Sequence, residues 1–244
     1  MRLGVNVDHI ATLRQARRGS QPDPVSTARQ CEQAGATSIV CHLREDRRHI
    51  QDADVRRLKR SVTTWLNLEM AMAKPIIEAA LAVRPEQVTL VPERRRELTT
   101  EGGLDVCSRV PALQRLVRTF HARRIEVSLF VDPSPRHIMA AARTGARIIE
   151  LHTGAYANAR TPRQRSRALR ALRGAARMGR ALGLSIAAGH GLDYENVAAV
   201  AQIPEIEEVN IGFAIVARAL EVGLSRAVHD MAACLRRARK YHAR

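Results

Sequence analysis

The sequence has few aromatic residues: phenylalanine, tyrosine and tryptophan together make up 3% of the chain. Proteins that bind single-stranded nucleic acids stack bases on such side chains, so few stacking platforms are available. A formal net charge of +16 would otherwise favour a nucleic-acid ligand. The arginines, however, are dispersed, and between Arg160 and Arg180 they recur every two to four positions around a helix. We therefore expect a solvated basic surface and no nucleic-acid partner, with a basic nucleic-acid-binding protein as the alternative from a different functional class.

The chain also has only four cysteines, which lie far apart at Cys31, Cys41, Cys107 and Cys234. This spacing contains neither a disulfide framework nor a zinc pattern of the C-x-x-C type, and it suits a reducing compartment.

No stretch approaches the roughly 20 consecutive apolar residues of a membrane span. Residues 1–7 show no charged and apolar leader. We therefore expect a cytoplasmic protein without membrane contact.

Short apolar or β-branched runs alternate with longer helical patterns along the 244 residues. The alternation predicts a parallel sheet with crossover helices, and eight such units favour a closed barrel. The predicted strands are 3–8, 38–42, 64–69, 87–91, 126–131, 147–151, 185–188 and 207–211. The predicted helices are 24–34, 52–60, 75–83, 111–123, 135–144, 162–182, 193–202, 213–222 and 225–239. We therefore predict one domain over residues 1–244, an α/β fold of the (β/α)8 TIM barrel type with an additional C-terminal helix.

Polar side chains follow these strands at their carboxyl ends, where (β/α)8 barrels form their active sites. Five of the nine histidines fall at or just beyond these ends: His9, His42, His49, His152 and His190. An imidazole that titrates near neutral pH can transfer protons there. A single polar residue at a strand end can be a mere transition to solvent, but the shared position of these histidines indicates a common active site.

Glu69 closes the third predicted strand and is expected to face the barrel mouth. Desolvation there would raise the pKa of its carboxyl group toward a value useful for acid–base catalysis. The alternative is a structural ion pair with a neighbouring arginine.

Histidines and carboxylates at a barrel mouth are also typical of metal-dependent hydrolases. The sequence has neither H-x-H on the first strand nor H-E-x-x-H anywhere. We therefore expect no metal and no other cofactor. A metal-assisted hydrolase or isomerase acting on a phosphorylated small molecule stays as the alternative.

Two kinds of segment predict phosphate binding. Residues 189–191 and 210–213 contain glycines, which let backbone N–H groups approach phosphate oxygens in the loops after the last two strands. Residues 44–48 supply arginines. Such sites fit a pair of phosphorylated substrates or one bisphosphate. The loop at 99–103, which lacks the apolar periodicity needed to pack, is interpreted as a mobile lid, with an irregular loop of no special function as the alternative.

Lysine is scarce, with only Lys59, Lys74 and Lys240 in the chain. An imine-forming barrel aldolase needs a lysine on a strand, and none of the predicted strands contains one. If imine chemistry takes place, a substrate must bring the amine.

Several segments form distinctive motifs: G-V-N-V-D-H-I-A-T-L-R at 4–14, H-L-R-E-D-R-R-H-I at 42–50, N-L-E-M at 67–70, L-V-P-E at 90–93, T-T-E-G-G-L-D at 99–105, E-L-H-T-G at 150–154 and G-H-G-L at 189–192. Together they resemble the pyridoxine 5′-phosphate synthase family. The resemblance extends from the first strand to the last. It implies an enzyme that joins 3-amino-2-oxopropyl phosphate to 1-deoxy-D-xylulose 5-phosphate, giving pyridoxine 5′-phosphate, inorganic phosphate and water. The aminoketone would then supply the amine.

The resemblance also implies roles for individual residues. His42, Glu69 and His190 resemble the acid–base groups, and Glu150 the residue that stabilises a transition state. The ligands of the aminoketone phosphate would be Asn6, Arg17, Gly191, Gly212 and the residue at position 213. The ligands of the deoxyxylulose phosphate would be Asp8, His9, Arg44, His49 and Thr99.

Two positions depart from the family pattern. Phe213 stands where histidine is expected, so only its backbone N–H would meet phosphate, and Ala187 stands where asparagine is usual. The family further implies a loop that closes after the fourth strand and a homo-octamer built from dimers.

Overall fold

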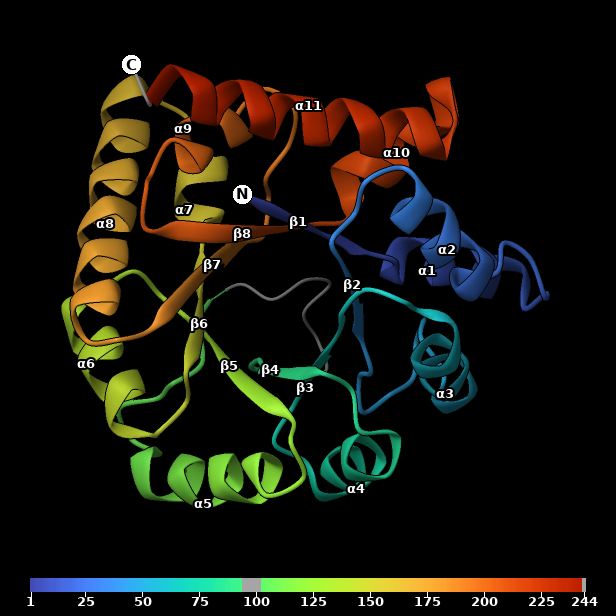
Figure 1. Cartoon of the computed structure of the whole chain (residues 1–244), viewed down its shortest axis with the longest axis horizontal. Helices are drawn as coiled ribbons and strands as arrows, with labels where there is room; N and C mark the ends of the chain where they lie inside the picture. Colours follow the sequence, from blue (N-terminus) through green and yellow to red (C-terminus); the bar gives the residue numbers. More distant parts are fainter. Residues whose placement is uncertain (94–101, 243–244) are drawn as a thin grey trace.

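The computed structural model describes residues 1–93 and 102–242, and its strands form a closed parallel barrel (Figure 1). Each strand pairs with the next in the chain, and the last pairs with the first. The strands are β1 (Arg2–Asn6), β2 (Ser38–His42), β3 (Leu66–Met70), β4 (Gln87–Leu90), β5 (Glu126–Val131), β6 (Ile148–His152), β7 (Ser185–Gly189) and β8 (Ile206–Ile211). The predicted barrel and its eight strands are confirmed.

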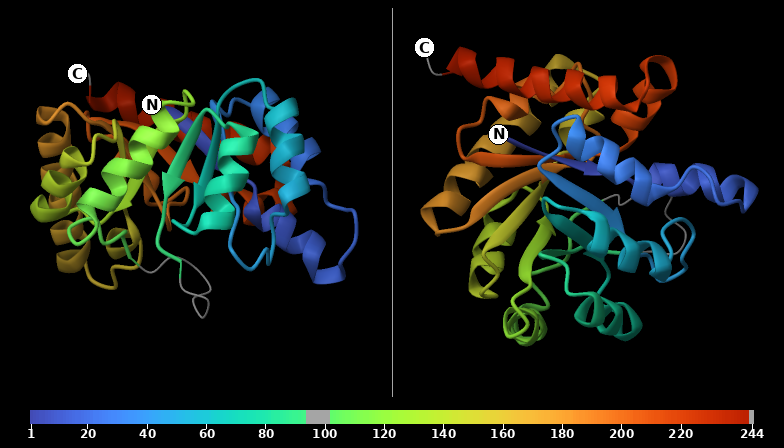
Figure 2. Two further views of the ribbon diagram at one scale, coloured as in Figure 1. Left: turned by 90° about the horizontal axis from the view of Figure 1, so that it is seen from below. Right: turned by 45° about the vertical axis from the view of Figure 1, so that its right-hand side comes forward.

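Helices surround the strands as an outer ring (Figures 1 and 2). They are α1 (Asp8–Arg17), α2 (Pro24–Gln33), α3 (Asp52–Ser61), α4 (Lys74–Val83), α5 (Val110–His121), α6 (Pro135–Arg143), α7 (Gly154–Ala157), α8 (Pro162–Ala181), α9 (Val197–Ala201), α10 (Phe213–Val222) and α11 (Leu224–His242). The additional C-terminal helix is confirmed as α11. No helix of the described chain is long and apolar enough to cross a membrane.

The predicted first strand was wrong at its end, because Asp8 begins helix α1 instead of closing β1. The alternation of valines with Asn6 and Asp8 continues the strand pattern beyond the point where the chain turns. At that point the Asn6 Oδ1 atom accepts the backbone N–H of Asp8 at 2.8 Å. Helix α1 then buries Ile10 and Arg14 at helical spacing. Neither α1 nor the short α7 was predicted.

The predicted helix at 193–202 is shorter in the structure, where α9 begins only at Val197. Asp193 and Asn196 account for the difference. The Asp193 Oδ1 atom accepts the Asn196 backbone N–H at 2.8 Å, and the Asn196 Oδ1 atom accepts the Asp193 backbone N–H at 2.9 Å. Such local side-chain bonds hold the chain in a turn and compete with the helix.

The interior of the barrel contains buried polar side chains that hydrogen-bond to one another across neighbouring strands. Leu66, Leu68 and Met70 alternate along β3 and are fully buried, whereas Asn67 between them accepts a hydrogen bond from Thr89 on β4 at 2.8 Å. The Ser38 hydroxyl likewise donates to Glu208 at 3.3 Å across β2 and β8. Because side chains alternate along a strand, the apolar set packs against the helices and the polar set shares the inside of the barrel.

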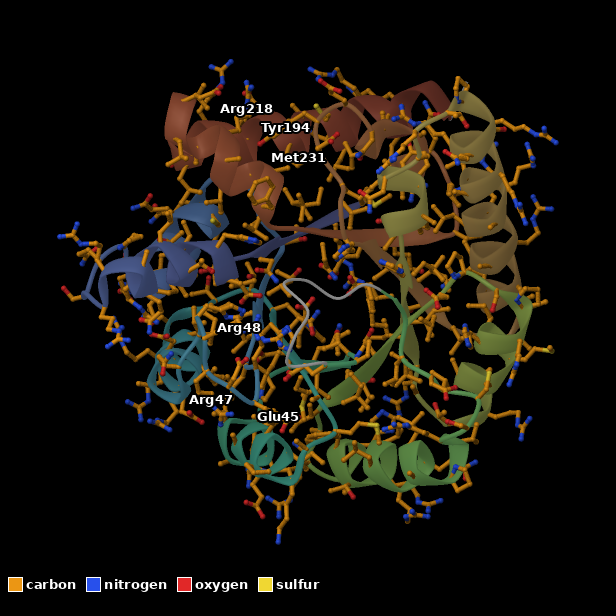
Figure 3. All side chains as sticks on the ribbon, turned by 180° about the vertical axis from the view of Figure 1, so that it is seen from behind. Glu45, Arg47, Arg48, Tyr194, Arg218 and Met231 are labelled. Carbon is orange, nitrogen blue, oxygen red and sulfur yellow. The ribbon has the colours of Figure 1, made fainter. Side chains whose placement is uncertain are left out.

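Helices α10 and α11 close the wall beside β8 and β1 (Figure 1). Arg218 of α10 stacks over the ring of Tyr194 at 5.0 Å, and the Tyr194 hydroxyl donates to the backbone oxygen of Ala227 at 2.8 Å. These side chains gather with Met231 where the two helices meet (Figure 3).

Candidate active site

Asp8, His42 and Glu69 converge at the carboxyl ends of β1, β2 and β3. One ligand atom from each lies within 4.8 Å of the others. The Asn6 amide joins the group, since its Nδ2 atom donates to the Asp8 Oδ2 atom at 3.0 Å and to the Glu69 Oε2 atom at 3.4 Å. The strand ends predicted from sequence therefore form one cluster of titratable groups.

His42 is held at both its backbone and its ring. Its backbone N–H donates to the Asp8 Oδ1 atom at 2.8 Å, and its Nε2 atom lies 2.7 Å from the Glu93 Oε1 atom. The other Glu93 oxygen accepts the backbone N–H of Glu45 at 3.0 Å. Burial alone would raise the pKa of Glu93, but the hydrogen bond and charge of His42, with Glu45 and Arg44, lower it. Glu93 is thus a carboxylate that orients the imidazole.

Glu69 lies in an environment that opposes its negative charge. Burial raises the pKa of its carboxyl group well above the ordinary value, and the negative charges of Glu150 and Asp8 raise it further. Within residues 1–93 and 102–242, the hydrogen-bond partner of this carboxyl group is Asn6, and no arginine pairs with it. The environment favours the acid–base interpretation over a structural ion pair.

Glu150 lies on the opposite wall, on β6. Its Oε2 atom accepts the Asn210 amide at 2.7 Å, and the residue is buried. Burial raises the pKa of Glu150 to about 7, with a smaller contribution from Glu208, although the Asn210 bond opposes the shift. Ala187, one of the departures from the family pattern, is the β7 partner of Glu150 in the sheet register.

His190 follows β7 with a strained backbone, at φ +82°. The Thr153 hydroxyl donates to the backbone oxygen of His190 and, at 2.7 Å, to that of Gly189, which holds this turn in place. Burial lowers the pKa of His190 to about 4, and the positive charge of His152 lowers it further. The imidazole of His190 is therefore neutral near pH 7.

His152 connects His190 to a carboxylate. Its ring meets the ring of His190 in an edge contact, with centroids 5.0 Å apart. Its Nδ1 atom lies 3.2 Å from the Asp132 Oδ1 atom, and Phe130 packs on it at 5.2 Å. The hydrogen bond from His152 lowers the pKa of Asp132. Asp132, His152 and His190 form a row along one side of the mouth.

The glycines predicted to bind phosphate lie at the two expected turns. Gly191 has φ +76°, and Gly212 is the residue before helix α10. The side chain of Phe213 is 68% exposed and meets the ring of His9 at 5.3 Å. Burial lowers the pKa of His9, although the charge of Asp8 opposes this shift.

His49 and Arg44 lie on the β2 side of the mouth. The His49 ring lies 6.2 Å from that of His42, its Nδ1 atom accepts the Ile50 backbone N–H at 2.8 Å, and burial lowers its pKa. Arg44 is 4% exposed and pairs with Asp46 at 3.4 Å. Glu45, Arg47 and Arg48 lie beside one another at this edge (Figure 3). The arginine-rich segment thus reaches the mouth.

Two predicted ligands are not brought to this cluster by the described structure. Arg17 is exposed on the last turn of α1 and makes no hydrogen bond or ion pair with a described residue. Thr99 and most of the predicted lid lie outside the described residues.

Sequence reasoning missed the partner residues Glu93 and Asp132. Glu93 lies three residues after β4, and Asp132 directly follows β5. A polar side chain at the carboxyl end of a barrel strand is the sequence signal that could have identified both residues.

Comparison with known proteins agrees with this geometry. A family model described as "Pyridoxal phosphate biosynthesis protein PdxJ" matches residues 3–237. The chain belongs to the PdxJ family. Among the curated relatives of this PdxJ chain, a pyridoxine 5′-phosphate synthase from Synechococcus sp. (strain JA-2-3B'a(2-13)) is 57% identical over 94% of this chain and 96% of its own length. One from Syntrophobacter fumaroxidans is 53% identical over 95% and 98%.

Solved structures of more distant proteins support the fold. Monomers of a dimeric phosphoribosylanthranilate isomerase from Thermotoga maritima align with a TM-score of 0.60 at 14% identity, covering 97% of this PdxJ chain and 98% of theirs. At this identity the likeness shows a shared barrel only.

Proposed function

We propose that this PdxJ enzyme makes pyridoxine 5′-phosphate by joining 3-amino-2-oxopropyl phosphate to 1-deoxy-D-xylulose 5-phosphate, with Glu69, His42 and His190 as its proton-transfer groups. Inorganic phosphate and water leave. The amine of the aminoketone attacks the ketone of its partner, so the imine needs no lysine of the enzyme. The few lysines of the chain support this division of labour, since none lies on a strand of the barrel.

The environment of Glu69 carries the proposal. Because burial, Glu150 and Asp8 all raise the pKa of Glu69, its surroundings favour the protonated carboxyl group, the form that can donate a proton and then recover it. The Asn6 amide fixes the orientation of that carboxyl group at 3.4 Å. Ring formation requires protons to be removed from and returned to carbon and oxygen atoms. A reversible acid in the mouth can carry out part of these transfers, and the two histidines carry out the rest.

The two histidines take different parts. His190 is neutral near pH 7, because burial lowers its pKa to about 4, and a neutral imidazole accepts protons. His42 has the Glu93 carboxylate 2.7 Å from its Nε2 atom, a contact that orients its ring in the mouth. We assign His190 as a base and His42 as the second proton-transfer histidine in the elimination and ring-closure steps.

Glu150 is proposed to stabilise positive charge in a transition state. Its pKa of about 7 is raised by burial, and a cationic imine in the mouth would draw the group toward its ionised form.

The substrate phosphates are proposed to bind on two sides of the mouth. For the aminoketone phosphate, Gly191 and Gly212 offer backbone N–H groups, and Gly212 and Phe213 form the start of α10, whose dipole favours an anion. Asn6 and Arg17 complete this set. For the deoxyxylulose phosphate, the proposed ligands are Asp8, His9, Arg44, His49 and Thr99.

The test mixes purified protein with both substrates and follows the absorbance of the pyridoxine ring and the release of phosphate. Glu69→Gln should reduce turnover by about 10²- to 10⁴-fold, the usual contribution of a general acid or base. It should leave the circular dichroism spectrum and the binding of each phosphate substrate unchanged. The control is Glu207→Gln, because Glu207 lies on β8 but pairs with Arg180 on the outside at 2.6 Å. Near-normal turnover by the Glu69 variant would remove this residue from the mechanism.

A further inference from the structure

A short segment before α5 presents two metal-binding side chains on one side. Leu104 and Val106 are buried, whereas Asp105 between them is exposed and Cys107 is partly exposed. The segment is fixed to β5, because the Leu104 backbone N–H donates to the Phe130 backbone oxygen at 2.7 Å. Asp105 and Cys107 therefore face outward beside each other.

His137, on the first turn of α6, faces this pair. One ligand atom each from Asp105, Cys107 and His137 lies within 4.8 Å of the other two. The Nδ1 atom of His137 is buried and has no hydrogen-bond partner in the described part of the chain. A buried imidazole nitrogen without a partner is costly unless it meets a proton donor or a metal ion.

We propose that Asp105, Cys107 and His137 bind a divalent transition-metal ion of the Zn²⁺ class, at a site outside the barrel mouth. Thiolate, imidazole and carboxylate are the ligands that zinc takes in proteins, whereas Ca²⁺ and Mg²⁺ prefer oxygen. The thiolate and the carboxylate balance the charge of the ion. With three protein ligands and Asp105 exposed, water completes a tetrahedral shell.

Closing the site requires only small side-chain movements. Tetrahedral zinc separates its ligand atoms by about 3.5 Å, given metal–ligand distances of about 2.0–2.3 Å. The hydrogen bonds that Cys107 and Asp105 now make are either long or involve an exposed hydroxyl group that water can satisfy instead. The Cys107 thiol donates to the Arg136 backbone oxygen at 3.7 Å, and Asp105 accepts the Ser108 hydroxyl at 2.6 Å. The neighbouring Arg109 and Arg136 are exposed, so their charges can turn toward water.

A bound ion would tie residues 105–107 to α6. Gly103, just before these residues, contacts the active site, because its backbone N–H donates to the Asp132 Oδ1 atom at 3.0 Å. Metal binding at this site should therefore stabilise the fold, without contributing a group to the reaction and without changing turnover.

The test adds Co²⁺ to chelator-treated full-length protein without substrates. Cobalt bound to a thiolate gives a charge-transfer band in the near ultraviolet, and Zn²⁺ should displace it at one equivalent. Cys107→Ser should abolish the band, and His137→Asn and Asp105→Asn should each weaken Zn²⁺ binding by at least about 100-fold, because loss of an outer-shell partner alone costs about 10- to 100-fold.

Cys234→Ser is the matched control, because Cys234 is the other partly exposed cysteine and lies on α11, away from the cluster. Its variant should keep the band and a Zn²⁺-dependent rise in melting temperature, both of which His137→Asn loses. A thiolate band that survives Cys107→Ser, or no thiolate band in the unmodified protein, overturns the proposal. Because no substrate is present, neither result bears on the proposed reaction.

Discussion

The Nδ1 atom of His152 lies 3.2 Å from the Oδ1 atom of Asp132. The same imidazole meets the ring of His190 at 5.0 Å, so a carboxylate orients a histidine that in turn packs against a proposed base. This arrangement fixes which His152 nitrogen carries its proton, since a carboxylate favours N–H on the side that faces it.

Asp132→Asn is expected to lower kcat by about 10- to 100-fold with little change in KM, because a misplaced catalytic group costs rate rather than substrate contact. It should also shift the pH–rate profile, which a purely structural role for Asp132 would leave in place. Steady-state kinetics between pH 5 and 9 check both effects. Asp230→Asn is the control, since Asp230 pairs with Arg218 on α10 at 2.6 Å. An unaltered pH profile contradicts the positioning role.

Glu150 should make the protein less stable as the pH rises. Its pKa is about 7 in the folded chain against an ordinary 4.5, so the folded state holds its proton more tightly than the unfolded state. The stabilisation is complete below about pH 4.5 and is lost as the pH rises to about 7. Urea unfolding at several pH values measures this loss of unfolding free energy, which Glu150→Gln should not show. If the variant loses stability with pH as steeply as the unmodified protein, the raised pKa of Glu150 is contradicted.

His190 contributes the opposite slope. Its pKa falls from an ordinary 6.5 to about 4 on folding, so its contribution is present above about pH 6.5 and is lost as the pH falls toward 4. The two groups therefore oppose each other between pH 4.5 and 6.5 in the unmodified protein. Urea unfolding at several pH values in this range measures how steeply the unfolding free energy changes with pH. This slope should differ more between Glu150→Gln and His190→Asn than between either variant and the unmodified protein.

Gly154 gives room to the two histidines beside it. An added Cβ atom would lie 2.5 Å from the His152 Nε2 atom and 3.3 Å from the His190 Cδ2 atom. Because Asp132 and Phe130 hold the His152 ring, Gly154→Ala should displace it, lower turnover and cost about 1–3 kcal/mol of unfolding free energy. Gly174→Ala on α8 is the control, since an added Cβ meets nothing there within 4 Å. Equal activity of both variants would contradict the proposed crowding.

Dialysis against a chelator should leave turnover unchanged, even though Asp8, His42 and Glu69 could contact one ion. The Nε2 atom of His42 is occupied by Glu93 at 2.7 Å, and the raised pKa of Glu69 favours a neutral carboxyl group, which binds metals poorly. Activity assays before and after dialysis measure this. Loss of activity that a divalent ion restores would support the metal-assisted alternative.

The sequence by itself determined the barrel fold and most of the residues proposed to act at its mouth. Runs with a period of two and segments with helical patterns specify which side chains face the sheet and which face water. Because active sites of (β/α)8 barrels lie at the carboxyl ends of the strands, the sequence also predicted His42, Glu69 and His190 as site residues. The same reasoning failed at Asp8, where a local hydrogen bond from its own backbone to Asn6 turns the chain out of the strand. The alternation of apolar and polar residues continues through this turn, so the sequence pattern does not show where the strand ends.

Only the tertiary structure decided how these groups act on one another. The contact of His42 with Glu93 joins residues 51 positions apart, and that of His152 with Asp132 joins the end of β6 to the residue after β5. The raised pKa of Glu69 depends first on its burial and then on the charge of Glu150 across the barrel. Local periodicity shows whether a side chain is buried, but charge interactions depend on distances between segments, which only the closed barrel sets.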